Sequence, residues 1–199
     1  MRKGHPMMKR ALLPALLAIP LAGCVSLTPE PPEQLLTLTP ASTAPTGADV
    51  GGTAEAALAL VEPEAEQRLD VTRVPVQVNE SSVAYLKDAV WIEKPTRLFR
   101  QLVAETIRAR GGRLVVGEGD LAYGAATKLS GRLLDMGYDA ASGSVVVRYD
   151  AVLQTPDGNV RTRRFESRVP GVAADVGAVG PALNQAANQI AAEVAAWVG

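Results

Sequence analysis

The chain has 199 residues, with 20 basic and 21 acidic side chains and a formal net charge of −1 at neutral pH. It contains one cysteine, Cys24, and one histidine, His5. A single cysteine excludes an internal disulfide framework. The length suits one domain once a leader is removed.

The first 23 residues have the parts of a secretory signal. Residues 1–10 carry four basic and no acidic residues, and residues 11–22 form an uncharged apolar run. That run is shorter than the roughly 20 residues that a membrane-spanning helix requires. Leu21, Ala22, Gly23 and Cys24 resemble the bacterial lipobox at all four positions. The alternative is an ordinary secretory signal with a cysteine nearby.

The lipobox predicts that signal peptidase recognises Leu21, Ala22 and Gly23, and that Cys24 begins the mature protein. Cys24 would carry S-linked diacylglycerol and an N-acyl chain such as palmitate, and we expect no other cofactor and no metal. Removal of the leader leaves 16 basic against 21 acidic residues. The mature chain should therefore have no general affinity for nucleic acid or for an anionic membrane surface. Its membrane anchor would be the acyl chains, which bind stably when two or more are present.

A proline-rich tether, residues 24–33, follows the cleavage point. Ten residues from Cys24 reach roughly 30 Å in an extended, polyproline-like chain. Leu35–Thr39 is predicted to be a short strand. Residues 40–55, rich in Pro, Gly, Ser and Thr, are predicted to be a disordered loop.

The next stretch alternates between strand and helix signals. Residues 56–61 and 69–78 are strand candidates, and residues 113–116 form a shorter one. Between them, residues 96–110 carry apolar side chains at helical spacing. Thr96 is the predicted N-cap of this helix, and Gly111-Gly112 the predicted stop.

The C-terminal third predicts an antiparallel meander followed by a helix. Three strands are expected, at residues 128–139, 145–155 and 160–169, joined by turns at 141–143 and 156–159. Gly180-Pro181 is expected to open the last helix, with Pro181 at its first position. The apolar stripe expected for this helix consists of Leu183, Ala187, Ile190, Val194, Trp197 and Val198. Residues 34–199 are therefore predicted to form a single α+β domain, with two helices on a mainly antiparallel sheet.

Catalytic residue types are scarce. The only imidazole lies in the leader and the only thiol is assigned to lipidation, which excludes a Ser-His-Asp triad, a cysteine nucleophile and Cys/His zinc sites in the mature domain. Four carboxylates of the meander are the remaining candidates for a hydrolase, and solvated surface is the alternative interpretation. They are Asp135, Asp139, Asp150 and Glu166.

Two segments are candidates for a partner surface. The strand at 160–169 carries Arg161, Arg163 and Arg164, with Arg168 further along. These arginines predict either a docking patch for an acidic protein or lipid headgroup, or charges that protect an edge strand from aggregation. Tyr85 and Trp91 belong to an aromatic and apolar segment that is either core or partner surface.

The order of features from Leu35 onward resembles the ABC-type transport auxiliary lipoprotein family, the PqiC-like group. Four features carry this resemblance: the strand Leu35–Leu38 after the lipidated cysteine, the segment Tyr85–Asp88, the segment Trp91–Pro95 before a helix with Leu98, Leu102 and Ile107, and an Ala-rich last helix with Trp197. The family's pattern departs at Glu33-Gln34, where aromatic residues are usual, and at the short stretch 87–90.

This resemblance implies a non-enzymatic accessory subunit of an ABC transport system. Such a system includes a permease, an ATPase and a mammalian-cell-entry-type substrate-binding protein, and it moves lipids between membranes. Val25 stands after Cys24, and by the sorting rule of enterobacterial lipoproteins this implies the outer membrane, facing the periplasm. The alternative is an envelope assembly lipoprotein of the lipopolysaccharide-export or Tol type. The oligomeric state stays open, and includes a homo-oligomer.

Overall fold

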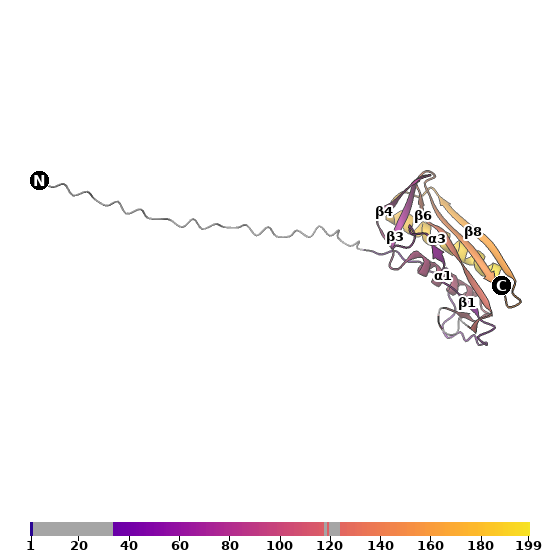
Figure 1. Ribbon diagram of the computed structural model, residues 1–199. Helices are drawn as coiled ribbons and strands as arrows, with labels where there is room; N and C mark the ends of the chain where they lie inside the picture. The colour runs from indigo at the N-terminus through magenta and orange to yellow at the C-terminus, as the bar shows by residue number, and fades with distance from the viewer. Residues whose placement is uncertain (2–33, 118, 120–123) are drawn as a thin grey trace. The chain divides into compact units, whose positions relative to one another are not determined.

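The computed structural model describes residue 1, residues 34–117, residue 119 and residues 124–199 (Figure 1). Cys24, the preceding lipobox residues Leu21, Ala22 and Gly23, and the predicted tether lie outside these residues.

The fold is organised around one long strand, β6 (Thr127–Asp139). On one side, β6 pairs antiparallel with β7 (Ser144–Gln154), which pairs antiparallel with β8 (Val160–Pro170). These three strands confirm the predicted meander and are the long ribbons in Figure 1.

Three short strands lie in succession along the other side of β6, each parallel to it. They are β1 (Leu58–Leu60), β2 (Glu64–Ala65) and β3 (Arg73–Asn79). The sheet is completed by β5 (Val115–Val116), parallel to β1, and by β4 (Ser82–Val90), antiparallel to β3. The predicted α+β class is confirmed, and the sheet is mixed because β6 has parallel partners along one side.

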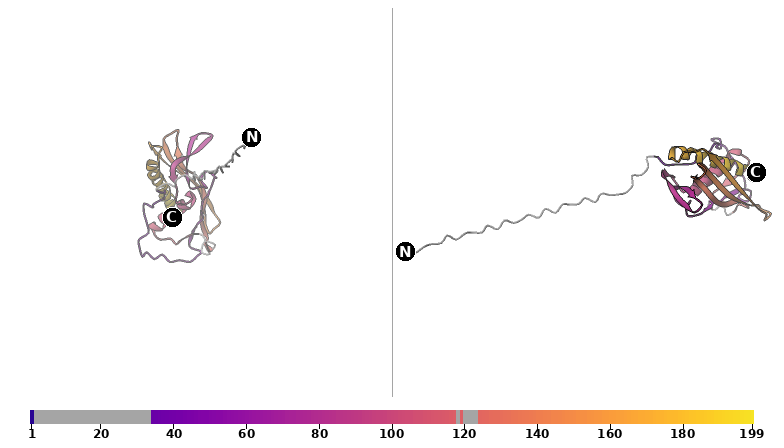
Figure 2. Two further views of the ribbon diagram at one scale, coloured as in Figure 1. Left: turned by 90° about the vertical axis from the view of Figure 1, so that its left-hand side faces the viewer. Right: turned by 90° about the horizontal axis from the view of Figure 1, so that it is seen from above.

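Both long helices lie on the same face of the sheet. They are α1 (Pro95–Arg110) and α3 (Val176–Val198), and Figure 2 shows α3 along the long strands. The apolar stripe predicted for the last helix is the packed face of α3, where Leu183, Ile190 and Val194 are fully buried. Buried alanines between them allow close approach of the helix to the sheet: Ala182, Ala186, Ala187, Ala191 and Ala195.

The predicted starts of both helices were wrong, and the predicted stop was right. At α1, Lys94 is the cap position and Pro95 opens the helix, whereas Thr96 is buried and its hydroxyl donates to Glu62 Oε1 at 2.7 Å. At α3, the Asp175 side chain accepts from the Ala178 N–H at 3.0 Å, so the helix begins before Pro181. Gly111 ends α1 with φ of +73°, a conformation that favours glycine.

The N-terminal segment is attached to the fold by a strip of backbone hydrogen bonds. The predicted strand at 35–39 is reduced to one parallel bridge between Leu36 and Trp91. The Leu36 N–H donates to the Val90 carbonyl at 2.7 Å, and the Ile92 N–H donates to the Leu36 carbonyl at 2.9 Å. Strand β4, which leads into this bridge, was missed by the sequence patterns.

The predicted disordered loop, residues 40–55, has no helix or strand but is tied to both helices at its start. The N–H groups of Thr39 and Ala41 donate to the side-chain oxygens of Asn184 and Asn188, at 2.8 and 2.7 Å. The Ala44 N–H donates to Glu105 Oε1 at 2.8 Å. The first residues of the loop therefore have fixed partners, which composition alone does not indicate.

Candidate functional site

The four candidate carboxylates all lie on the face of the sheet opposite the helices. On β7, Val147, Tyr149 and Ala151 belong to the core, so Arg148 and Asp150 between them point to the other face. The register brings Glu166 of β8 beside Arg148, and Arg164 beside Asp150. We call the side of β6, β7 and β8 that carries these residues the outer face.

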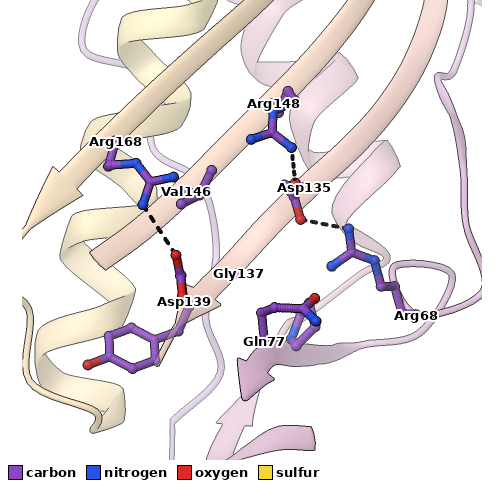
Figure 3. Close-up of a pocket in the computed structure, with 10 residues that line it drawn as sticks. Arg68, Gln77, Asp135, Gly137, Asp139, Val146, Arg148 and Arg168 are labelled. Carbon is purple, nitrogen blue, oxygen red and sulfur yellow. Dashed lines mark hydrogen bonds and ion pairs between the residues drawn. The ribbon is translucent and has the colours of Figure 1, made fainter. Parts of the chain in front are cut away.

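Asp135 is the centre of this arrangement (Figure 3). Its two carboxylate oxygens accept from Arg68 Nη2 at 2.6 Å and from Arg148 Nη1 at 2.7 Å. The pairing register shifts between Leu133 and Asp135, which is a β-bulge. The bulge keeps Leu133 and Met136 in the core while Asp135 reaches the outer face.

The other three carboxylates are also paired with arginine. Arg148 Nε donates to Glu166 at 2.7 Å, and Arg164 binds Asp150 through two bonds of 2.6 and 2.7 Å. Arg168 Nη1 donates to Asp139 at 3.3 Å (Figure 3). Each candidate acid therefore has at least one guanidinium partner.

Hydrogen bonds lower the pKa of three of these carboxyls, Asp139, Asp150 and Glu166, and so favour their ionised form. The pKa of Glu166 is lowered chiefly by the hydrogen bond from Arg148, and that of Asp150 by the bond from Arg164. The Ser142 hydroxyl, followed by Arg168, lowers the pKa of Asp139. A general acid needs a pKa near the working pH, so these three groups are poorly suited to that role.

The pocket beside Asp135 is a shallow polar depression of about 250 Å³. It is lined by residues of β3, β6, β7 and β8 and by one residue of the turn before β3. These are Arg68, Pro75, Gln77, Asp135, Gly137, Tyr138, Asp139, Val146, Arg148 and Arg168. Within the described residues, no group of three or more Asp, Glu, His or Cys side chains could hold a metal ion. The geometry fits a surface held by ion pairs, as the solvated-surface interpretation predicted.

The structure divides the predicted arginine patch between two faces. Arg164 and Arg168 lie on the outer face and are paired with acids. Arg161 and Arg163 lie on the helix side of β8, opposite Leu153 and Ala151 of β7. The four arginines therefore do not form one surface, because neighbouring residues of a strand point to opposite faces.

Of the two aromatic residues predicted for a partner surface, Trp91 is buried, whereas Tyr85 stays a candidate. Trp91 is only 2% exposed and belongs to the core, which corrects the surface hypothesis for this residue. Tyr85 is half-buried, and the guanidinium carbon of Arg73 lies 4.3 Å from its ring centroid. The large apolar residue that is exposed in this segment is Ile92.

Sequence reasoning did not identify the arginine partners of the carboxylates. The tight turn at 156–159 could have given the register, since Gln154 opposite Val160 places Asp150 opposite Arg164 and Arg148 opposite Glu166. Arg68 carries no such signal, because it reaches Asp135 from the turn before β3, 67 residues away in sequence.

No described helix is both long enough and apolar enough to cross a membrane. The structure is an α+β domain in which the acidic residues Asp135, Asp139, Asp150 and Glu166 form ion pairs with arginines on the outer face. The chain belongs to the family described as ABC-type transport auxiliary lipoprotein component, whose model matches residues 36–195. No curated protein matches it.

Two solved structures share the fold. The protein XCC0632 of Xanthomonas campestris, of the DUF330 family, is 20% identical, with a TM-score of 0.70 over 83% of this chain and 94% of that one. An uncharacterized protein is 12% identical, with a TM-score of 0.64 over 83% of this chain and 100% of the other. These likenesses establish the fold, and family membership associates the chain with an ABC-type transport system.

Proposed function

We propose that this protein is a lipid-anchored, non-enzymatic accessory subunit of an ABC-type lipid transport system. The observation that carries the proposal is the family match over residues 36–195, nearly the whole described domain. We assign its partners as a mammalian-cell-entry-type substrate-binding protein with its permease and ATPase. Its location would be the outer membrane, facing the periplasm.

The anchor would be Cys24 with its diacylglycerol and N-acyl chain. The described fold begins ten residues later, at Gln34, and Leu36 is already bonded to the core segment at Val90 and Ile92. A fully extended tether of ten residues spans roughly 30 Å. The domain would therefore remain close to its leaflet.

A non-enzymatic role is supported by the state of the acidic residues. The carboxylates that could act as a catalytic pair are engaged by Arg68, Arg148, Arg164 and Arg168. An arginine cannot be deprotonated in proteins, so the guanidinium groups cannot serve as acids. The lowered pKa of Asp139, Asp150 and Glu166 makes these three carboxyls poor general acids near neutral pH.

The test is recovery of the complex from native envelopes. The full chain, tagged after Gly199, is isolated from detergent-solubilised membranes and its partners are identified by mass spectrometry. We expect a mammalian-cell-entry-type protein or its permease. An intact, lipidated protein that recovers neither would contradict the transport assignment.

A matched variant tests the anchor separately. Cys24→Ala should give a folded domain that no longer sediments with the outer membrane on a density gradient, and transport should fail. Full transport by this unlipidated form would contradict the anchored mechanism while leaving the family assignment intact.

A further inference from the structure

Strand β8 is an open edge of the sheet, next to β7 in the meander of β6, β7 and β8. Within the described part of the chain, β8 pairs with β7 only, over the whole length from Val160 to Pro170. Residues 160–169 contain no proline, so every one of them has a backbone N–H. An edge of this length is a template for an added strand.

The helix-side arginines of β8 are held in place by aromatic rings. The guanidinium carbon of Arg161 lies 5.0 Å from the ring centroid of Trp197, and that of Arg163 lies 4.8 Å from the ring centroid of Phe165. Trp197 and Phe165 contact each other edge to face, with centroids 5.8 Å apart. The stacked rings therefore fix two positive charges beside the open edge.

These two charges differ from the other arginines of the strand. Arg164 and Arg168 are neutralised by Asp150 and Asp139, whereas no described carboxylate lies within ion-pair distance of Arg161 or Arg163. The uncompensated charge is confined to the first half of β8. It favours an acidic ligand over a basic one.

We propose that the edge of β8 from Val160 to Phe165 binds an acidic, extended segment of a partner protein as an additional strand. Backbone hydrogen bonds to the open edge provide the affinity. Alternate side chains of the added strand lie on the helix side, where carboxylates meet Arg161 and Arg163. The side chains between them lie beside Thr162 and Arg164 on the outer face.

A second copy of this chain is a poor occupant of the same edge. Antiparallel pairing of the segment 160–165 with the same segment of a second copy would place Arg161 opposite Arg163 or Arg164 of that copy, and like charges opposite each other destabilise a sheet. The surface therefore selects a partner of opposite charge.

The edge is also remote from the point where the chain enters the fold. Leu36 packs next to Gly180 near the start of α3, whereas Trp197 is near its end. The 17 residues between them span about 26 Å of helix at 1.5 Å per residue. If the chain is anchored as proposed above, the edge stays accessible to a soluble domain.

The test measures peptide binding to the purified full-length lipoprotein in detergent. The probe is a fluorescein-labelled ten-residue peptide of alternating glutamate and valine, and the comparison peptide has lysine in place of glutamate. Anisotropy should show binding of the acidic peptide and none of the basic one. A third peptide, the acidic one with alternate backbone nitrogens methylated, should bind at least tenfold more weakly because it cannot form the strand.

Variants locate the site. The double substitution Arg161→Glu with Arg163→Glu should weaken the acidic peptide at least tenfold while circular dichroism stays unchanged. The matched control, Lys87→Glu with Arg110→Glu, makes the same change in net charge at exposed residues elsewhere and should bind normally.

Several results would overturn the proposal. If the methylated peptide bound as tightly as the unmethylated acidic peptide, strand addition would be excluded. If both double variants lost affinity for the acidic peptide equally, the binding would depend on net charge and not on Arg161 and Arg163. Self-association that depends on Arg161 and Arg163 would identify a second copy as the occupant. Recovery of transport partners from envelopes is a separate measurement, so either result can fail while the other stands.

Discussion

The two faces of the β6–β8 sheet are stabilised by different forces. The helix side is apolar, and its contacts include Tyr149 against Phe99, with ring centroids 5.1 Å apart. The outer face is covered by neither α1 nor α3, and Asp135, Asp139, Asp150 and Glu166 on it are paired with arginines. Burial dominates stability on the first face, because exposed ion pairs contribute only about 0–1 kcal/mol each. Apolar burial on the helix side therefore contributes most of the stability of this sheet, and the ion pairs of the outer face contribute little.

The largest effect is expected from truncation of the helix-side core. Ile190 is fully buried on α3, so Ile190→Ala removes apolar contacts and leaves a cavity. We expect a loss of about 2–5 kcal/mol in the free energy of unfolding, measured by urea denaturation. The control Ala192→Ser, on the exposed side of the same helix, should change stability by less than about 0.5 kcal/mol. Similar losses in both variants would contradict the contrast between the faces.

A smaller loss is expected where β6 lies under Tyr149. Gly131 has φ of +154°, and a Cβ there would lie 2.0 Å from the Asp150 carbonyl oxygen and 2.9 Å from the Tyr149 ring. Gly131→Ala should destabilise the protein by about 1–3 kcal/mol through overpacking and strain. The glycine Gly158, in the exposed turn between β7 and β8, has no atom within 4 Å of such a Cβ, so its replacement by alanine adds only the backbone strain of its φ of +83°. Its replacement should cost less, which urea titration of the two variants would show.

Removal of one outer-face arginine should cost less again. Arg148 serves both Asp135 and Glu166, so Arg148→Met leaves two carboxylates with fewer partners. We expect a loss of about 1 kcal/mol at neutral pH, measured at low ionic strength and reduced by added salt. A loss as large as that of Ile190→Ala would show that the outer face carries core-like energy.

The smallest effect concerns Arg164, which binds only Asp150, and it should depend on pH. The folded protein lowers the pKa of Asp150, chiefly through the Arg164 bond. A carboxyl with a lowered pKa adds stability above its unfolded pKa, near 4, and this contribution disappears as the pH falls through the folded value. Arg164→Met should therefore be less stable than the wild type at pH 7, and the difference should shrink as the pH falls below the unfolded pKa and through the lowered pKa of the folded state.

Urea midpoints of the two proteins between pH 7 and pH 2 would measure that convergence. Thr162→Ala, on the same face of β8 but without a charge, is the matched control and should show no such pH dependence. A constant difference between Arg164→Met and the wild type at all pH values would exclude the ion pair as its cause.

Sequence patterns predicted the long elements well and the short ones poorly. Strands β6, β7 and β8 were predicted because alternation over ten or more residues distinguishes a buried from an exposed side. β4 was missed because its buried apolar residues, Leu86 and Ala89, are three positions apart and do not follow the alternation that identifies a strand. The start of α3 was misplaced because Pro181 indicated a first turn, whereas the Asp175 cap fixes it.

The candidate site shows the same division. Its residue types were recognisable in the sequence, and the absence of histidine and cysteine from residues 34–199 already argued against common catalytic sites. Pairing was not predictable for Arg68, which reaches Asp135 over a separation of 67 residues. Trp91 stayed open between core and surface in the sequence, and the fold buries it where Leu36, 55 residues earlier, forms a bridge with it.

The sequence by itself determined the lipobox expectation at Cys24, the family resemblance, the α+β class and the apolar stripe of the last helix, because each depends on short-range patterns or on composition. Only the tertiary structure decided which charges are compensated. Strand pairing brought Arg148, Arg164 and Arg168 to their acids and left Arg161 and Arg163 on aromatic rings at an open edge. The physical reason is that alternation assigns each residue to a face, whereas the partner it meets there is set by register and by chain segments distant in sequence.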